Sequence, residues 1–435
     1  MRGKMLKILK NNINIEKLCN QLIWHFTVIL FVVFGLLEGH ELIQILMYGI
    51  TGCVGCLIII KERTTFRPKI QSYHLIIAAF LCICYASSLW GIKDGYAFST
   101  SGYIARMFIC MSVFYYHYGK LESTESLLQA IKWGGYLLAV CSLIGFGLKN
   151  VIEILLHGGR LFNEFVCFID GEVVPGLFHG ICSVNINYLG LHVAIPLVIG
   201  MYDVTHNRKK IIYECPFLIL STLFLIISGG KMNFLILFLG VFLVLLKKTI
   251  HKDMKKTILR WFMLLIIGIG LLFVLSKISM FEATFSRFFD MAKSLLGISY
   301  DTSTNDRTYS IKIGIEQFLN SPVLGIGVDN VRLILEKEMG LNTYIHCNYI
   351  ELLVGIGIIG VTAFYACYII PWIQMYKCRI CKDSQMVVCT FLIILILVAD
   401  VASVTYTWRA TYLYFALFFI QARNMKIKAK NDNFL

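Results

Sequence analysis

The sequence predicts an all-α polytopic membrane protein, and two observations carry that prediction. Of the 435 residues, 58% are hydrophobic and 15% are charged, whereas about a quarter of the residues of an ordinary soluble domain are charged. Apolar runs of a length that can cross a bilayer also recur from one end of the chain to the other. We therefore expect a bundle of membrane-spanning helices.

Twelve apolar runs give the expected spanning helices, of which the last is the shortest. In chain order they are 21–37, 42–60, 73–91, 103–118, 127–148, 181–202, 211–227, 232–246, 261–276, 349–373, 386–402 and 408–420. The first run follows a basic stretch and has no small-residue cleavage site after it. We therefore expect it to be retained as a helix rather than removed as a signal peptide.

Basic residues predict the orientation of these helices, because short cytoplasmic loops are enriched in Lys and Arg. If the N-terminus is cytoplasmic, the cytoplasmic segments include "KERTTFRPK", "NRKK", "KKTIHKDMKKTILR" and "KCRICK", whereas outer loops such as "EGHE" are neutral or acidic. This alternation predicts that both termini are cytoplasmic, in an inner or plasma membrane. It also explains the net charge of +14 without nucleic acid as a partner.

The longest polar stretch, 277–348, is predicted to be an outer loop between the ninth and tenth helices. It divides a single integral membrane domain into helices 1–9 in 1–276, the loop itself, and helices 10–12 with a cytoplasmic tail in 349–435. The loop breaks the positive-inside pattern, and its cations are suited to bind an anion. They are Lys277, Arg287, Lys293, Arg307, Lys312, Arg332 and Lys337.

Within this loop, "DRTYSIKIGIEQFLNSP" predicts a short helix along the outer membrane surface. Asp306 is suited to cap its start and Pro322 to end it, with Arg307 in the first turn. The apolar residues that share one face of this helix are Ile311, Ile315, Phe318 and Leu319.

No metal or other cofactor is expected. The fifteen cysteines lie mostly within apolar runs, where a thiol behaves as a small hydrophobe. Two CxxC pairs, Cys53/Cys56 and Cys378/Cys381, lack the second pair of ligands that a zinc site needs. The sequence also contains no Asp-x-Asp motif of the kind that holds Mg²⁺ on a diphosphate.

A group of spaced residues between 305 and 360 points to a known family. They are Arg307, Ser321, Pro322, Gly325, Gly327, Asn330, His346, Gly357 and Gly360. This pattern resembles the core of the O-antigen ligase and polymerase superfamily, the membrane glycosyltransferases that build bacterial surface polysaccharides. In that family the residue after the histidine is usually Asn, Ser or Gln. It is Cys347 here, and Asn348 is suited to replace the missing amide.

Two further stretches extend the resemblance to about 175–375. In "ISGGKMNFLILFLG", Lys231 stands where the family commonly has an outer-face arginine, and lysine keeps the charge but loses the bidentate fork. In "GLFHGICSVNINYLG", Asn185 or Asn187 matches an asparagine ahead of the sixth helix.

The chemistry that the family performs suggests roles for these residues. Nucleotide sugars are absent outside the cytoplasm, so the donor must carry its own leaving group, as an undecaprenyl-diphosphate-linked oligosaccharide does. Arg307 is the candidate for stabilising the diphosphate, with Lys231 and Arg160 as further substrate-binding cations. His346 is the candidate general base for the acceptor hydroxyl. One direct displacement would invert the anomeric configuration.

Each of these residues also has a simpler interpretation. His346 would then be a hydrogen-bonded interfacial residue, and Arg307 a helix cap or a headgroup contact. Lys231 and Arg160 would be snorkelling cations.

Polar residues near helix ends complete the predicted site. Glu351, one turn into its helix, is expected to orient His346 or a neighbour, because an ionisable group within a membrane is costly. Asp400 and Arg409 are weaker candidates for such a role. The remaining residues predicted to bind substrate are Asn330 and Asn348.

The predicted function is polymerisation of a surface polysaccharide (O-antigen, capsule or exopolysaccharide) by transfer of a lipid-linked oligosaccharide to an acceptor sugar hydroxyl on the outer face. The segment "NYIELL" resembles polymerase members and favours a polymerase over a ligase that transfers the glycan to a lipid or protein. A repeat-unit flippase and a non-catalytic scaffold are the alternatives from other classes. The sequence shows no internal repeat of the kind common in transporters, which favours the enzyme.

Overall fold

The computed structural model describes residues 2–38, 40–62, 66–169, 171–182, 184–249, 254–275, 293, 302–378 and 383–431. Its long helices are α1 (Arg2–Leu36), α2 (Leu42–Glu62), α3 (Ser72–Trp90), α4 (Ala97–Lys120), α5 (Thr124–Phe146), α7 (Ile186–His206), α8 (Ile211–Ile227), α9 (Lys231–Thr249), α10 (Met254–Leu275), α12 (Thr302–Asn320), α14 (Asn348–Lys377), α15 (Ser384–Ala399) and α16 (Arg409–Asn431). The predicted loop cations Lys277 and Arg287 and the predicted CxxC residue Cys381 lie outside the described residues.

Each of the twelve predicted spans overlaps an observed helix, in the order α1 to α5, α7 to α10 and α14 to α16. Within the described residues, seven helices are long and apolar enough to cross a membrane, namely α1, α2, α3, α4, α5, α7 and α14. Helices α8 and α15 are apolar but shorter. The chain is therefore a helical, multi-pass membrane protein, and the count of twelve spans stays a prediction.

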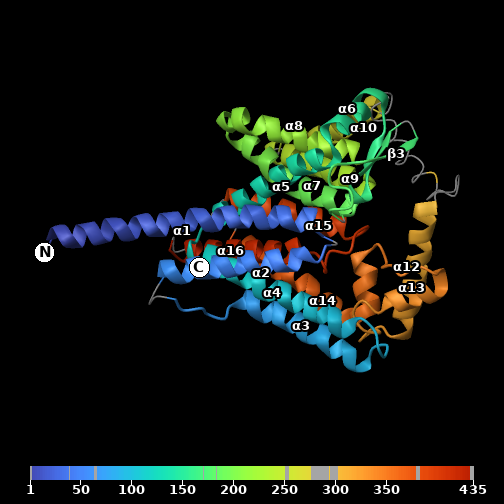
Figure 1. Ribbon diagram of the computed structural model, residues 1–435, viewed down its shortest axis with the longest axis horizontal. Helices are drawn as coiled ribbons and strands as arrows, with labels where there is room; N and C mark the ends of the chain where they lie inside the picture. Colours follow the sequence, from blue (N-terminus) through green and yellow to red (C-terminus); the bar gives the residue numbers. More distant parts are fainter. Residues whose placement is uncertain are drawn as a thin grey trace.

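Helices α7 and α16 form the centre of the bundle, and most of their side chains are buried. Helices α5 and α9 pack on α7, α4 and α14 pack on α16, and α3 packs on α14. Figure 1 shows the long helices running roughly along the length of the molecule. Both termini lie toward one end, and α12 and α13 (Val331–Met339) lie at the other.

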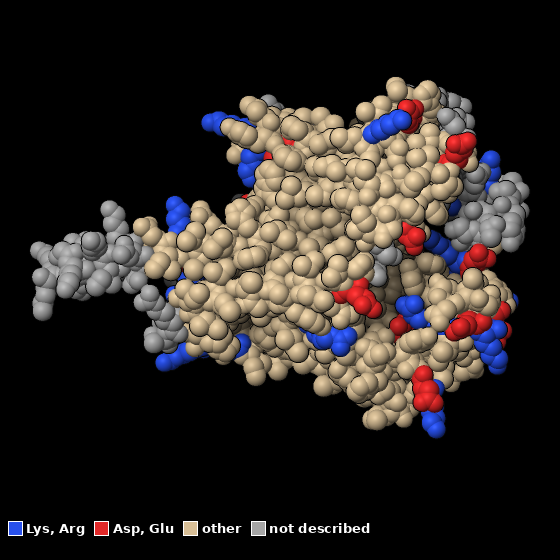
Figure 2. Space-filling model, in the orientation of Figure 1, with Lys and Arg blue, Asp and Glu red and all other residues tan. Residues whose placement is uncertain are grey.

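The charged side chains differ between the two ends. In Figure 2, basic side chains predominate toward the end that carries the termini, whereas acidic and basic side chains are mixed around α12 and α13. This distribution favours the predicted orientation, because Lys and Arg accumulate on the cytoplasmic side of membrane proteins.

The segment between α5 and α7 contains a small sheet that the sequence did not predict. Helix α6 (Leu148–His157) is followed by the antiparallel strands β1 (Arg160–Phe162), β2 (Val166–Ile169) and β3 (Glu172–Pro175). Each strand has only three or four residues. Strands this short carry too little alternation of apolar and polar residues to be recognised in the sequence.

Helix α12 is the predicted surface helix, but it begins earlier than expected, at Thr302. Arg307 therefore lies in its second turn rather than its first, and Asp306 lies inside the helix rather than at its cap. The expected start was wrong because several preceding residues in "TSTN" are also of the types that cap helices. Figure 1 shows α12 running across the direction of the long helices, as a surface helix should.

The face of α12 that packs on the rest of the protein differs from the predicted face. Ser310, Ile313 and Gly314 are buried, and α12 packs on α14. Ile315 and Leu319, which were expected on the packed face, are 43% and 68% exposed. An interfacial helix can leave such side chains outside the protein, because lipid replaces the protein contact.

The glycine-rich turn after α12 docks onto a break in α14. Gly357 lies within α14 with φ 63° and ψ −170°, which interrupts the helix. The hydrogen bonds across the break are Ile326 N to Val354 O (2.9 Å), Gly327 N to Gly355 O (2.8 Å) and Ile358 N to Pro322 O (3.0 Å). The turn therefore satisfies backbone groups that the break releases, as a membrane environment demands.

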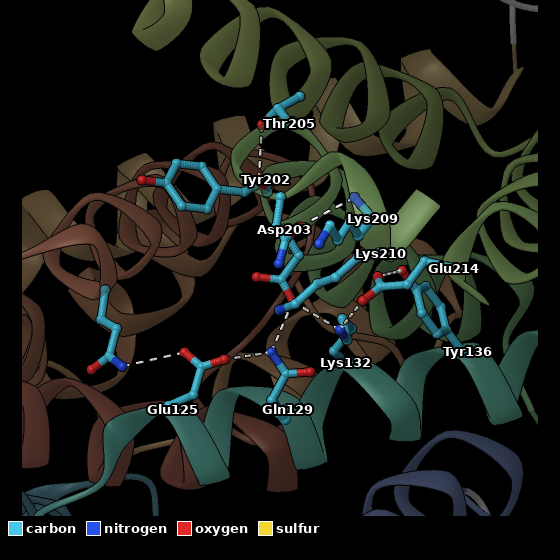
Figure 3. A network of polar contacts seen from close by, with 12 residues as sticks. Glu125, Gln129, Lys132, Tyr136, Tyr202, Asp203, Thr205, Lys209, Lys210 and Glu214 are labelled. Atoms are coloured by element: carbon cyan, nitrogen blue, oxygen red, sulfur yellow. Dashed lines mark hydrogen bonds and ion pairs between the residues drawn. The ribbon is translucent and has the colours of Figure 1, made fainter. Parts of the chain in front are cut away.

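A buried ion network joins α5, α7 and α8 (Figure 3). The side chain of Lys132 is 1% exposed and pairs with Asp203 at 2.8 Å and with Glu214 at 2.5 Å. Tyr136 donates a hydrogen bond to Glu214 at 3.0 Å, and Gln129 donates one to Asp203 at 2.8 Å. Because two carboxylates compensate its charge, the lysine is tolerated inside the helix bundle.

Candidate functional site

A small polar cavity lies at the end of the bundle that carries α12. Its volume is about 40 Å³, which suffices for ordered water. The lining residues are Glu38, Asn185, Asn187, Tyr188, Arg307, Tyr344, His346, Ala402, Ser403, Val404 and Trp408. The structure therefore brings together His346, Arg307 and both asparagines singled out in the sequence. Figure 2 shows that the surface at this end of the molecule is hollowed.

His346 is held by the segment that joins α13 to α14. Helix α13 ends at Gly340, whose φ of 68° is left-handed. The N–H of Ile345 then donates to Glu351 Oε2 at 2.7 Å. The ring of Tyr344 meets the ring of His346 edge to face, with 4.6 Å between centroids. Glu351 therefore fixes the backbone beside His346, and its predicted role in orienting the imidazole stays a prediction.

The imidazole of His346 is neutral at neutral pH. Burial lowers its pKa, and the guanidinium of Arg307 lowers it further, to about 4. A neutral ring nitrogen can accept a proton, which is the state that a general base needs before it acts. Arg307 and His346 thus place a cation and a neutral imidazole at one cavity.

The turn that begins α13 supports the histidine segment from a second side. Arg332 pairs with Asp329 at 2.6 Å and lies over the ring of Tyr344, 5.5 Å from its centroid. Asn330 is fully buried. Its Oδ1 accepts from the N–H of Tyr96 at 2.7 Å, and its Nδ2 donates to a backbone carbonyl at 2.9 Å. Asn330 therefore joins two loops and does not line the cavity.

Asn348 connects α14 to the loop that forms the opposite wall of the cavity. Its Oδ1 accepts from the backbone N–H groups of Thr405 and Tyr406, at 2.9 and 3.1 Å. Its own N–H donates to the carbonyl of Asp400 at 2.8 Å. The carboxylate of Asp400 accepts from the hydroxyls of Tyr365 and Thr405. Asn348 and Asp400 are therefore positioned to hold the wall formed by 402–404, and neither lines the cavity.

The structure does not bring Lys231 or Arg160 to this cavity. Lys231 is the first residue of α9. Arg160 begins β1, and its guanidinium lies 5.1 and 5.0 Å from the ring centroids of Phe162 and Phe168. Aromatic contacts of this kind hold a guanidinium in place on a sheet.

Glu38 and Trp408 line this cavity although the sequence did not single them out, whereas Arg409, a weaker candidate in the sequence, does not line it. Glu38 Oε2 and Arg409 Nε are buried and have no hydrogen-bond partner among the described residues. Burial raises the pKa of Glu38 to about 8, and the charge of Arg409 opposes that shift. The acidic "EGHE" loop was visible in the sequence, but nothing there connects it with Trp408, which lies 370 positions further along.

Together, the fold and this cavity define a class, a multi-pass helical membrane protein with a polar, cation-bearing pocket at one end of its bundle. Residues 216–365 match the family model described as O-antigen ligase. That range runs from α8 into α14 and contains Lys231, Arg307 and His346. This part of the chain is therefore similar to the O-antigen ligase family, whose members are membrane glycosyltransferase-like enzymes, and the resemblance inferred from the sequence is confirmed. No curated protein matches the chain.

Proposed function

We propose that the protein is a surface-polysaccharide polymerase. It transfers an undecaprenyl-diphosphate-linked oligosaccharide to an acceptor sugar hydroxyl on the outer face of the membrane, without a metal ion. The observation that carries this proposal is that Arg307 and His346 border one cavity within the range matched to the family. Those two residues supply the cation and the base that the reaction requires.

The proposed reaction is a single displacement. His346 accepts the proton of the acceptor hydroxyl as that oxygen bonds to the anomeric carbon of the donor. The bond between the anomeric carbon and the diphosphate oxygen breaks, and Arg307 stabilises the charge that develops on the leaving diphosphate. The products are the extended glycan and the free polyprenyl diphosphate, and the anomeric configuration is inverted.

Glu38 lines the cavity and is suited to bind a sugar hydroxyl beside the base, because its buried Oε2 has no partner in the described structure. The cavity of about 40 Å³ is too small for a sugar, so substrate binding must widen it. The loop 402–404 and helix α12 are the walls that have to separate. Lys231 and Arg160 remain predicted donor contacts outside this cavity.

The test is transfer by the purified protein in lipid nanodiscs, with a synthetic lipid-diphosphate-linked repeat unit as substrate. We expect the wild type to form lipid-linked dimers and longer glycans. We expect His346→Ala and Arg307→Ala each to form these products at least about 100-fold more slowly. Matched controls are His157→Ala and Lys312→Ala. Both residues are exposed, neither lines the cavity, and Lys312 is on the same helix as Arg307.

Other products would redirect the proposal. Transfer to a lipid or protein acceptor, with no lipid-linked dimer, would identify a ligase. Movement of the intact lipid-linked unit across the bilayer without a new glycosidic bond would identify a flippase. Retained anomeric configuration would rule out the single displacement, and full activity of His346→Ala would remove the proposed base.

A further inference from the structure

A second and larger cavity lies at the opposite end of the molecule from His346. Its volume is about 450 Å³, and residues of α2, α3, α4, α16 and the segment 66–71 line it. Figure 1 shows that the segment between α2 and α3 lies toward the end that carries both termini. In the predicted orientation this end faces the cytoplasm, so the cavity is separate from the proposed transfer site.

Four cations from three segments line this cavity, namely Arg67, Lys69, Lys120 and Arg423. Lys120 pairs with Glu62 at 2.7 Å. Among the described residues, no ion pair joins Arg67, Lys69 or Arg423 to a carboxylate. The cavity therefore has an excess of positive charge that an anion would neutralise.

Aromatic side chains fix one wall beside these cations. The hydroxyl of Tyr115 donates to Gln71 Oε1 at 2.6 Å, and the hydroxyl of Tyr116 donates to Glu62 Oε2 at 2.5 Å. The ring of Phe66 packs edge to face on Tyr116, with 5.2 Å between centroids. These contacts hold the 66–71 segment, and with it Arg67 and Lys69, against α4.

The opposite wall is apolar and continues along α2. Ile58 is buried, whereas Ile59 is 55% exposed on a helix that is long and apolar enough to cross a membrane. A Cβ atom at Gly55 would meet nothing within 4 Å, so the surface of α2 is open at this point. The cavity thus combines a cationic rim with an apolar groove, which matches an amphiphile whose headgroup is anionic.

We propose that this cavity binds an anionic phospholipid. Its phosphate contacts Arg67, Lys69 and Arg423, and an acyl chain lies along α2 past Gly55 and Ile59. A free phosphate would use the cations alone and gain nothing from the apolar groove. A lipid uses both, so we assign the site to lipid. This proposal does not depend on the proposed glycan transfer.

Native mass spectrometry of the purified protein with added phosphatidylglycerol tests the charge. We expect the triple variant Arg67→Gln/Lys69→Gln/Arg423→Gln to bind phosphatidylglycerol about 100-fold more weakly than wild type. This estimate assumes that the loss of each cation weakens binding roughly fivefold. The matched control is Lys426→Gln/Lys428→Gln/Lys430→Gln. It removes the same charge from exposed parts of α16 that do not line the cavity. If both triple variants lose the same affinity for phosphatidylglycerol, the lipid is attracted by the overall charge of the protein, and the proposed site would be overturned.

The variant Gly55→Phe tests the groove, at a position where a Cβ atom meets no other atom within 4 Å. We expect this variant to bind phosphatidylglycerol at least tenfold more weakly. The phenyl ring would exclude a few methylenes of the acyl chain from the groove, and each buried methylene contributes about 0.8 kcal/mol. Unchanged lipid affinity of this variant, with a wild-type thermal midpoint, would overturn the lipid assignment. So would displacement of the lipid by equimolar inorganic phosphate, which would identify a site for free anions.

Discussion

Glu351 accepts a hydrogen bond from the backbone N–H of Ile345 at 2.7 Å, one residue before His346. Ile345 itself is fully buried. The carboxylate belongs to α14, whose first residues also bind the loop of the opposite wall. Both sides of the cavity are therefore held by the start of one helix, and the position of the proposed base depends on Glu351.

Replacement of Glu351 should disturb catalysis without removing the base. We expect Glu351→Ala to lower kcat by about 10- to 100-fold, because small displacements of a catalytic group have effects of that size. Glu351→Gln should retain most of the activity, since its amide oxygen can accept the same hydrogen bond. Measurement of kcat and KM for both variants checks this, with the exposed Glu338→Ala as the control. Equal losses in the Ala and Gln variants would indicate that the charge matters instead.

The rate should depend on pH through His346. Its pKa of about 4 means that the imidazole is neutral, and active as a base, throughout the neutral range. The rate of transfer should therefore stay level near neutrality and fall as pH decreases toward 4. In Arg307→Gln the nearby cation is lost, so the pKa of His346 should rise and the acid limb should move to higher pH. A pH profile of kcat/KM for the wild type and for Arg307→Gln measures the acid limb of each. If the two acid limbs coincide, the charge of Arg307 does not affect the pKa of His346.

The glycine turn should be intolerant of side chains where α14 breaks. A Cβ at Gly357 would lie 2.2 Å from the carbonyl oxygen of Val323, and φ there is 63°. We expect Gly357→Ala to destabilise the protein by about 3 kcal/mol or more, from strain plus steric overlap. Gly340→Ala is the matched control, with φ 68° and open space, and should cost about 1–2 kcal/mol. Thermal unfolding in detergent compares the two, and equal losses would mean that the contact with the turn is unimportant.

Removal of Lys132 should leave the buried carboxylate of Glu214 without its cation, whereas Asp203 keeps its ion pair with Lys210 at 3.2 Å. We expect Lys132→Met to destabilise the protein by about 3–5 kcal/mol. Adding Glu214→Gln to that variant should recover part of the loss, because the uncompensated charge of Glu214 is then gone. Unfolding of the single and double variants in detergent measures the recovery. A double variant less stable than Lys132→Met would show that the network is not held by charge compensation.

Much of the fold could be predicted because each spanning helix is encoded locally. A run of apolar residues of bilayer length forms a helix, since its backbone groups can be satisfied only within the segment. The break at Gly357 is different, because it exists only where the turn at 322–327 supplies partners from outside the helix. The sheet at 160–175 was missed since its strands are too short to show a period.

The helical membrane class and the resemblance to the O-antigen ligase family could be inferred from the sequence alone, and so could the choice of Arg307 and His346 as the candidates for the proposed chemistry. These follow from composition and from local spacing, which the chain carries whatever its tertiary structure. The three-dimensional arrangement was needed to find that Glu38, Trp408 and His346 share one cavity and that Asn330 and Asn348 do not line it. The physical reason is that a cavity is formed by contacts between distant segments, and such contacts leave no local pattern in the sequence.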